Sequence, residues 1–290
     1  MKTIYKVEEK SLLLEYLLKN VNDSKNNIKT YLKNGFIYVN DKNITKYNYE
    51  LKKDDIISIK FKREDIDILY EDKELIVVNK PNGLLTVSTE KSNNTLYRKV
   101  SSYVKENNKN NKIFIVNRLD KDTSGIVVFS KSEEVKNRLQ DNWNNIVRNR
   151  EYYAVVNGIT KDSDEIKSYL SEKNTYVYSS SNGKLAITRY KKVKSNDKFS
   201  LLKINILTGR KNQIRVHMKD IGNPIVGDKK YGLNEKTRLM LHCTKLEFIN
   251  NGKLISIKSD YPKIFDEFFR WGVYEKNIVV NNINNTFNWV

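Results

Sequence analysis

Cysteine and histidine are scarce in this chain of 290 residues. Cys243 is the only cysteine, so no disulfide can form within the chain, as is typical of proteins from a reducing compartment. His217 and His242 are the only histidines. With a single cysteine they are too few for the usual zinc ligand sets. The sequence therefore predicts a cytoplasmic protein that binds no metal.

Long apolar runs and nucleotide-binding motifs are also missing. No run reaches the roughly 18 apolar residues that a membrane-spanning helix needs. The first ten residues, MKTIYKVEEK, lack the apolar core of a signal peptide. Neither a GxxxxGK[ST] loop nor a GxGxxG motif occurs. We therefore expect no membrane segment and no nucleotide cofactor.

Basic residues outnumber acidic residues by a wide margin. The chain has 53 Lys and Arg against 35 Asp and Glu, which gives a formal charge of +18. A polyanion is the simplest partner for such a chain, and nucleic acid is the commonest one. A lysine-rich solvated surface without a partner is the alternative, and charge alone does not decide. The hydrophobic content of 39% is ample for a packed core, and the length indicates two domains.

Residues 1–62 are expected to form a small unit of their own. Leucines at helical spacing over 12–18 predict a first helix. A second helix is expected to begin after Ser24, a plausible N-cap, and to end at Gly35. The expected strands and turn follow at 36–39, 40–43 and 55–61.

The second helix carries three lysines on one face. Lys25, Lys29 and Lys33 are spaced i, i+4 and i+8, which stacks their charges. On spacing alone, an ordinary solvated face is the simpler interpretation. The order of two helices, the GFIYVN hairpin and the LKKDDIISI strand resembles the small alpha-L RNA-binding module. That resemblance implies that these lysines contact RNA, with Lys25 nearest to the position where the module usually has an arginine.

The remainder of the chain has a different pattern. Residues 61–68 resemble a short charged linker, and the catalytic domain is expected over 66–272, leaving 273–290 as an unassigned tail. Many short strands rich in Ile, Val, Leu and Tyr follow one another without regularly alternating helices. This pattern favours an α+β fold around a mainly antiparallel central sheet. Helices are expected at 95–106, 132–146, 211–220 and 262–270.

A polar turn after the apolar segment IFIV is the first candidate for chemistry. In NRLDKDTSG (117–125), Arg118 and Asp120 lie two residues apart, so in extended backbone their side chains can pair. A guanidinium nearby favours the ionised carboxylate, which can then act as a nucleophile or base. By itself the pattern is more typical of a surface salt bridge, which contributes little.

Two further segments carry candidate residues. In REYYAVVNG (150–158), strand alternation places Tyr152 on one sheet face, where a core role is the simpler interpretation. In LTGRKNQIRVHM (207–218), a strand gives way to a helix that bears Arg215. A helix start with nearby arginines suits a phosphate or a carboxylate, although a solvated basic face is equally compatible with the spacing.

Taken together, these segments resemble the RluA family of RNA pseudouridine synthases. The resemblance covers nearly all of 66–250, and the alpha-L-like module precedes it. Its blocks lie at 72–87, 117–132, 150–158, 207–218, 222–232 and 238–248. The resemblance implies the pseudouridine synthase fold, RNA as the partner and a reaction that needs no cofactor.

The resemblance also implies a role for each matching residue. Asp120 occupies the position of the catalytic aspartate, and Arg118 that of the arginine that helps to place the flipped base. Tyr152 matches the tyrosine that stacks on the uracil and is thought to help with proton removal, and Arg215 matches the basic residue that pairs with the aspartate. The candidate substrate-binding residues are Asn117, Arg118, Arg210, Lys25, Lys29 and Lys33.

The sequence departs from the family pattern in two places. Asn117 stands where a histidine is common, and Lys211 and Asn212 replace a Thr-His pair. Both positions are expected to support the loop or to contact RNA.

The chemistry fits these residue types. A carboxylate can attack the sugar or assist elimination from it. The target base must leave its stack, at a cost of a few kcal/mol, and an aromatic side chain can repay part of that cost by stacking. We expect a monomer that acts on ribosomal or transfer RNA. A non-catalytic RNA-binding or ribosome-assembly factor and a DNA-binding structural protein are the alternatives.

Overall fold

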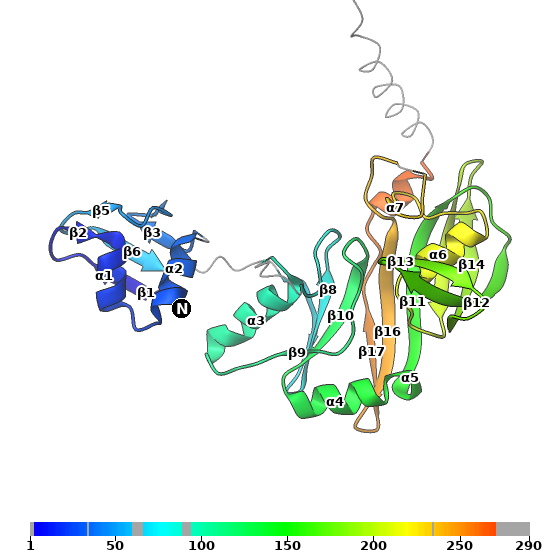
Figure 1. The fold of residues 1–290 in the computed structure, drawn as a ribbon, viewed down its shortest axis with the longest axis horizontal. Coiled ribbons are helices and arrows are strands. Elements are labelled where there is room, and N and C mark those ends of the chain that lie inside the picture. The colour runs from blue at the N-terminus through cyan, green and yellow to red at the C-terminus, as the bar shows by residue number, and fades with distance from the viewer. Residues whose placement is uncertain (1–2, 34, 60–65, 89–93, 234, 271–290) are drawn as a thin grey trace, which may run out of the picture. The chain divides into compact units, whose positions relative to one another are not determined.

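The chain divides into two compact units, Met1–Asp65 and Ile66–Val290. The computed structural model describes residues 3–33, 35–59, 66–88, 94–233 and 235–270 (Figure 1). Most of the expected linker and the tail expected at 273–290 lie outside the described residues. The two units are therefore treated separately.

The N-terminal unit combines two helices with short strands. Helices α1 (Leu13–Asn20) and α2 (Lys25–Lys33) follow one another along the chain. The main sheet has the order β1 (Thr3–Lys6), β6 (Ile56–Ile59), β3 (Ile37–Val39), β4 (Lys42–Asn43), and β2 (Ser11–Leu12) pairs with β5 (Glu50–Leu51). Leucine and isoleucine side chains of both helices and the sheet form its core.

The boundaries of α2 follow from local hydrogen bonds. The Ser24 hydroxyl accepts a hydrogen bond from the backbone N–H of Asn27 at 3.2 Å, which confirms its predicted capping role. At the other end, the Gly35 N–H donates to the Leu32 carbonyl. The three lysines of this helix are exposed, as its amphipathic pattern predicts.

The second unit is built on one 11-stranded sheet. Its main path runs β13 (Tyr176–Ser180), β12 (Ser163–Lys173), β14 (Lys184–Ser195), β15 (Phe199–Ile206), β11 (Val147–Asn157), β16 (Leu241–Asn250), β10 (Ser124–Ser130), β8 (Leu75–Lys80), β7 (Ile68–Glu71). Strand β17 (Lys253–Lys258) pairs with β16, and β9 (Phe114–Ile115) pairs with β10. Only the β10–β16 pairing is parallel among the described strand pairs. The predicted α+β class with a mainly antiparallel sheet is confirmed.

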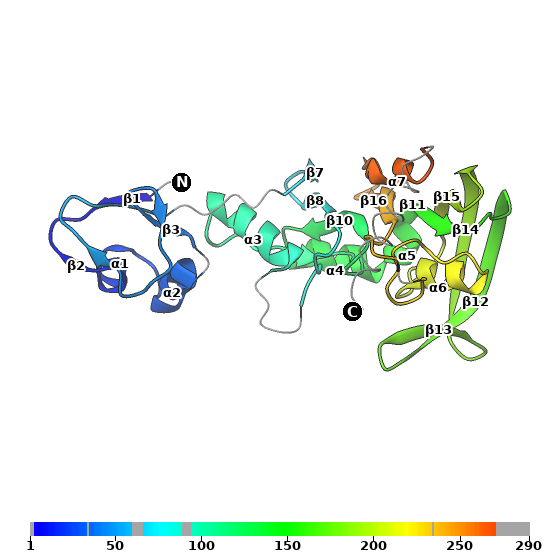
Figure 2. The same cartoon turned by 90° about the horizontal axis from the view of Figure 1, so that it is seen from above.

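Five helices are described in this unit. They are α3 (Leu96–Asn107), α4 (Glu133–Asp141), α5 (Trp143–Ile146), α6 (Gln213–Asp220) and α7 (Ile264–Glu267). The helix expected over 132–146 is two helices, because Asn142 ends α4 in a non-helical conformation. The helix expected over 262–270 is shorter than predicted. Figures 1 and 2 place α6 beside β12, β13 and β14, at the end of the sheet opposite to β7 and β8.

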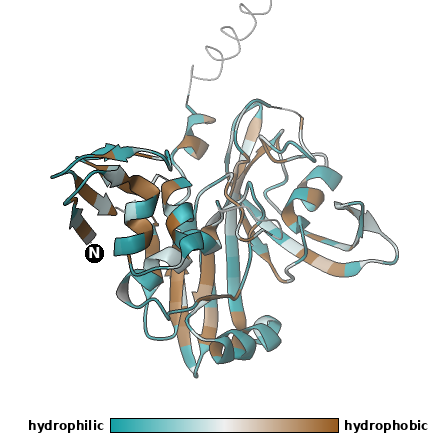
Figure 3. Ribbon diagram, turned by 60° about the vertical axis from the view of Figure 1, so that its left-hand side comes forward, coloured by the Kyte–Doolittle hydropathy of each residue, from teal (hydrophilic) through white to brown (hydrophobic). Residues whose placement is uncertain are grey.

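The middle of the sheet is the most apolar part of the unit. Every residue of β10 is buried, and β8 is buried at all but one position. Figure 3 shows brown, hydrophobic colouring along these central strands and more teal toward the β12–β13 end. Because the centre is packed on both faces, it can hold the loop between β9 and β10, residues 116–123, in a fixed position.

Candidate active site

Asp120 lies on the loop between β9 and β10, and buried donors hold this loop in place. Lys80 is fully buried at the end of β8. Its Nζ donates hydrogen bonds to the carbonyl oxygens of Pro81, Leu84 and Lys121 at 2.8–2.9 Å. The Thr86 hydroxyl donates to the Leu119 carbonyl at 2.9 Å. The backbone on both sides of Asp120 is therefore fixed by side chains from another part of the sheet.

A close approach between strands brings this loop to the rest of the site. Gly125, at the start of β10, has φ +115° and pairs with Cys243 of β16. A Cβ atom at Gly125 would lie 2.3 Å from the Cys243 carbonyl oxygen, so only glycine fits there. Cys243 is also the partner of Tyr152 on β11. Strand β16 thus lies between the Asp120 loop and the strand that carries Tyr152.

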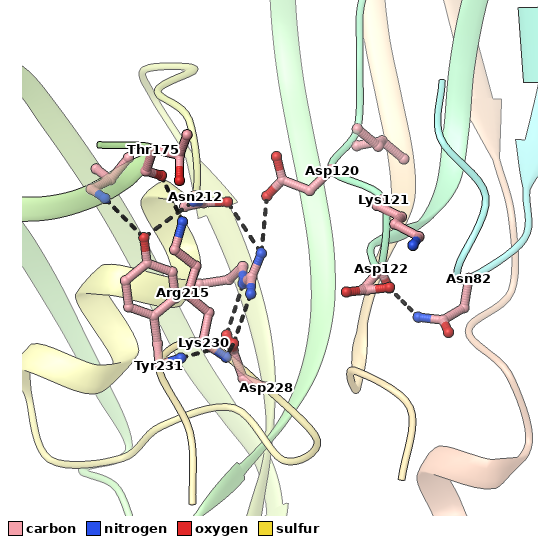
Figure 4. A network of polar contacts seen from close by, with 12 residues as sticks. Asn82, Asp120, Lys121, Asp122, Thr175, Asn212, Arg215, Asp228, Lys230 and Tyr231 are labelled. Atoms are coloured by element: carbon pink, nitrogen blue, oxygen red, sulfur yellow. Dashed lines mark hydrogen bonds and ion pairs between the residues drawn. The ribbon is translucent and has the colours of Figure 1, made fainter. Parts of the chain in front are cut away.

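Arg215 joins Asp120 to the second half of the site. Its Nη1 lies 3.7 Å from Oδ2 of Asp120 (Figure 4). Its Nε and Nη2 donate to the two carboxylate oxygens of Asp228 at 2.8 and 2.7 Å, and its Nη1 donates to Oδ1 of Asn212 at 3.2 Å. Bidentate pairing of this kind fixes the plane of a guanidinium. Arg215 therefore faces Asp120 in one orientation before any substrate binds.

Burial and charge act in opposite directions on the two carboxylates. Burial raises the pKa of Asp120 above its ordinary value, and the neighbouring Arg215 offsets only part of this effect. Burial would also raise the pKa of Asp228, but the hydrogen bonds and charge of Arg215 outweigh it and the pKa is lowered. Asp228 is thus the firmly ionised partner of Arg215, and Asp120 is the more basic carboxylate.

Tyr152 completes the cluster. Its side chain is buried on β11. Burial raises the pKa of Tyr152 well above its ordinary value, and the nearby Cys243 thiol and Asp120 carboxylate act in the same direction. The phenol therefore stays protonated at neutral pH. The structure brings together Asp120, Tyr152 and Arg215, the three residues that the sequence singled out for chemistry.

The other expected site residues of this unit lie around that cluster. Arg118 is exposed. The ion pair that it was expected to form with Asp120 is not present among the described residues, because the loop is not an extended strand there and Arg215 takes that place. Asn117 accepts a hydrogen bond from the Val128 N–H at 2.7 Å, which ties the loop to β10. Arg210 donates to the Leu185 carbonyl at 2.9 Å.

The segment before α6 contains the second departure from the family pattern, Lys211 and Asn212. Asn212 adopts a left-handed conformation with φ +53° and precedes the first turn of α6. Its side chain contacts both Arg215 and the Tyr231 hydroxyl. Lys211 pairs with Glu172 on β12. Asn212 therefore supports Arg215, whereas Lys211 lies at the exposed rim.

Sequence reasoning gave no role to Asp228 or to Lys80. Asp228 is the only acidic residue of the block 222–232. An isolated acid in a basic segment is the sequence feature that could have predicted a partner for Arg215. Lys80 ends a strand that begins with four apolar residues, 75–78. A lysine in such a strand is the sequence feature that could have predicted a buried charge. Lysines 25, 29 and 33 belong to the N-terminal unit.

The described residues also bear on metal binding and on membrane insertion. No group of three or more His, Cys, Asp or Glu side chains within the described ranges could hold a metal ion. No helix in the same part of the chain is long and apolar enough to cross a membrane.

Comparison with known proteins identifies the family. Residues 74–220 match the family model described as RNA pseudouridylate synthase. The chain is 31% identical to an uncharacterized RNA pseudouridine synthase of Mycoplasma genitalium, over 86% of this chain and 88% of that protein. It is 32% identical to the ribosomal large subunit pseudouridine synthase D of Borreliella burgdorferi, over 80% of both chains. It is 36% identical to the ribosomal large subunit pseudouridine synthase C of Rickettsia felis, over 70% of both.

The fold agrees with this relationship. The structure of human RNA pseudouridylate synthase domain containing 4 superposes with a TM-score of 0.59 at 21% identity, covering 69% of this chain and 90% of that chain. The chain belongs to the RluA family of RNA pseudouridine synthases. It is an enzyme that isomerises uridine in RNA to pseudouridine.

Proposed function

We propose that Asp120 is the catalytic nucleophile of this synthase and that the enzyme modifies ribosomal RNA. The arrangement of Asp120, Arg215 and Asp228 supports the assignment of Asp120 as the nucleophile. A buried, clamped guanidinium faces a carboxylate that is partly exposed, with 32% of its side-chain surface accessible. Such a carboxylate is oriented and reachable, and the facing guanidinium favours its ionised form, which are the properties of an activated nucleophile.

The reaction follows from this geometry. The Asp120 carboxylate displaces uracil from the sugar carbon or assists its elimination, so that the bond from the sugar to nitrogen 1 breaks and uracil leaves as an anion. After the base turns, carbon 5 forms the new bond to the sugar and the carboxylate is released. The proton on carbon 5 must then leave, and nitrogen 1 gains one. Arg215 stabilises the carboxylate at the start and end of this cycle.

Tyr152 has a more limited part in this scheme. A buried phenol that stays protonated is a poor general base. It is, however, a rigid aromatic surface beside Asp120, suited to stacking on the extruded uracil. We therefore assign stacking to Tyr152 and assign acceptance of the carbon 5 proton to the released Asp120 carboxylate.

The relatives and the N-terminal unit support a ribosomal substrate. The relatives from Borreliella and Rickettsia are named for the large ribosomal subunit. A relative from Vibrio cholerae is named a dual-specificity RNA pseudouridine synthase, so a second class of RNA substrate is the alternative. The N-terminal unit, with its exposed lysines 25, 29 and 33, fits an alpha-L module that holds the RNA backbone.

The test is a map of pseudouridines in total RNA, made by carbodiimide labelling and primer extension, from cells with and without the gene. The deletion is complemented with the wild type or with Asp120→Ala. We expect particular pseudouridines in ribosomal RNA to disappear and to return only with the wild type. Restoration by Asp120→Ala would remove Asp120 from the mechanism. An unchanged map, with RNA still bound by the purified protein, would favour the non-catalytic binder instead.

A further inference from the structure

Arg150, on β11, is a buried charge that the mechanism does not use. Only 9% of its surface is exposed. Within the described ranges its guanidinium has no hydrogen bond and no ion pair, while the next residue, Glu151, pairs with Lys203 instead. A largely buried guanidinium without a protein partner is costly, because it has lost much of its water and gained no hydrogen bond in return. Such a group is characteristic of a site whose partner arrives with the ligand.

The position of Arg150 shows where that partner would lie. Arg150 and Tyr152 are alternate residues of one strand, so they share a sheet face. On that face the guanidinium lies against Gly209, where a Cβ atom would be only 2.5 Å from Nη1. Gly209 therefore provides the space that the guanidinium occupies. Arg150 is thus adjacent to the expected stacking platform and to the segment that leads into α6.

The charge around Arg150 is positive. Burial lowers the pKa of Arg150, and the neighbouring Arg210 lowers it further, while the Tyr152 phenol and the Cys243 thiol act in the other direction. The Arg210 side chain donates only to the Leu185 carbonyl, and among the described residues it has no carboxylate partner either. Two guanidinium groups that influence each other, with no acid to neutralise them, form a site for an anion.

We propose that Arg150, together with Arg210, binds a backbone phosphodiester of the RNA at the target uridine and so positions the flipped nucleotide over Tyr152. The assignment rests on the proposed function, because it takes RNA to enter the cluster of Asp120, Tyr152 and Arg215. A phosphodiester is the anion that every RNA substrate brings to such a site. Arg150 is a positioning residue and takes no part in bond making.

Two measurements on the full chain test this assignment. The variant is Arg150→Met, which keeps the length of the side chain and removes its charge. The matched control is Arg148→Met, since Arg148 is an exposed arginine on the same strand. The first measurement is the melting temperature without RNA. The second is the affinity for a single-stranded oligouridylate at several salt concentrations.

We expect Arg150→Met to melt at the same or a higher temperature than the wild type, because an unpaired buried charge has been removed. We expect its RNA affinity to fall on the order of tenfold. The slope of log affinity against log salt should become shallower by roughly 0.7, the value for one phosphate contact on a single strand. Arg148→Met should change the affinity and the slope much less.

Three outcomes would overturn the proposal. A lower melting temperature with unchanged affinity would make Arg150 a structural residue. Equal losses in both variants would mean that Arg150 supplies only general positive charge. A weaker affinity with an unchanged slope would point to a neutral acceptor, such as a uracil carbonyl, instead of a phosphate. Neither measurement needs turnover, so failure of the wild type to form pseudouridine would count against the proposed function alone.

Discussion

The two units of this protein place their charges in opposite ways. The described part of the N-terminal unit buries apolar side chains and, among polar ones, only Ser58. Its many lysines lie at the surface. The second unit, which contains the Asp120 cluster and is the catalytic unit, buries several charged and titratable side chains, among them Lys80, Arg150, Arg215, Asp228, His217 and His242. The same basic composition is therefore used in two physical settings.

The difference shows what each setting allows. Exposed charges attract a polyanion at little cost in stability, but water and salt weaken each contact. Buried charges interact more strongly because the local dielectric is low, and each needs a specific partner. We therefore expect single substitutions to have large effects in the catalytic unit, and only combined substitutions to have measurable effects in the N-terminal unit.

The largest expected effect is that of Asp120→Asn on turnover. We expect a loss on the order of 10⁴-fold or more, because the amide cannot act as the nucleophile. RNA affinity and melting temperature should stay close to those of the wild type, since the shape is kept. Single-turnover assays with bound RNA measure this directly. The control is Asp122→Asn, a carboxylate two residues along the same loop that forms no ion pair with Arg215 among the described residues and should keep its activity.

The next largest expected effect is that of Lys80→Met on stability, because Lys80 holds the loop that bears Asp120. We expect Lys80→Met to lower the free energy of unfolding by roughly 3–5 kcal/mol, because it leaves three carbonyl oxygens, one of them in a buried hydrogen bond, without their shared donor. Denaturant titration measures this change. Lys73→Met alters an exposed lysine just before the same strand and should change stability by only about 0.5 kcal/mol. Similar values for both variants would show that burial does not distinguish these lysines.

A third effect is the pH dependence of the catalytic unit. Burial lowers the pKa of His217 and of His242 to about 4. Between pH 6.5 and 4 the unfolded state binds more protons than the folded state, so stability is present above 6.5 and is lost as pH falls. Each histidine should contribute on the order of 2–3 kcal/mol to this loss.

Unfolding titrations across that pH range test the assignment. His217→Gln keeps a hydrogen-bonding group between Ser168 and Thr188 and should make the loss between pH 6.5 and 4 smaller. His242→Gln should do the same at Ser124 and Ser259. A variant with the full wild-type pH dependence would show that the substituted histidine is not the titrating group.

The smallest expected effect is in the N-terminal unit. Combined substitution of Lys25, Lys29 and Lys33 by Ala should weaken RNA binding roughly tenfold and make its salt dependence shallower, with turnover of bound RNA unchanged. The matched control replaces three other exposed lysines of this unit, Lys42, Lys46 and Lys52. Equal effects of both triple variants would assign the contribution to net charge and not to the face of α2.

Sequence patterns predicted the strongly apolar or strongly periodic elements best. Strand β11 and helix α3 lie close to the strand expected at 150–158 and the helix expected at 95–106, because their apolar side chains pack into one core. Strands β12 and β13 were not expected. β12 alternates exposed and half-buried polar residues, so it has no apolar stretch to reveal it. Its position in the sheet is set by pairing with β14.

For this protein, the order of motifs by itself determined the family, the fold class and the three residues of the proposed catalytic cluster. Only the tertiary structure decided which partner each of them has. Asp120 faces Arg215 and not its sequence neighbour Arg118, and Asp228 orients that arginine. Lys80 and Arg150 are likewise ordinary basic residues in the sequence. Burial gives them their roles, because a charge removed from water must find a partner in the fold or in a ligand.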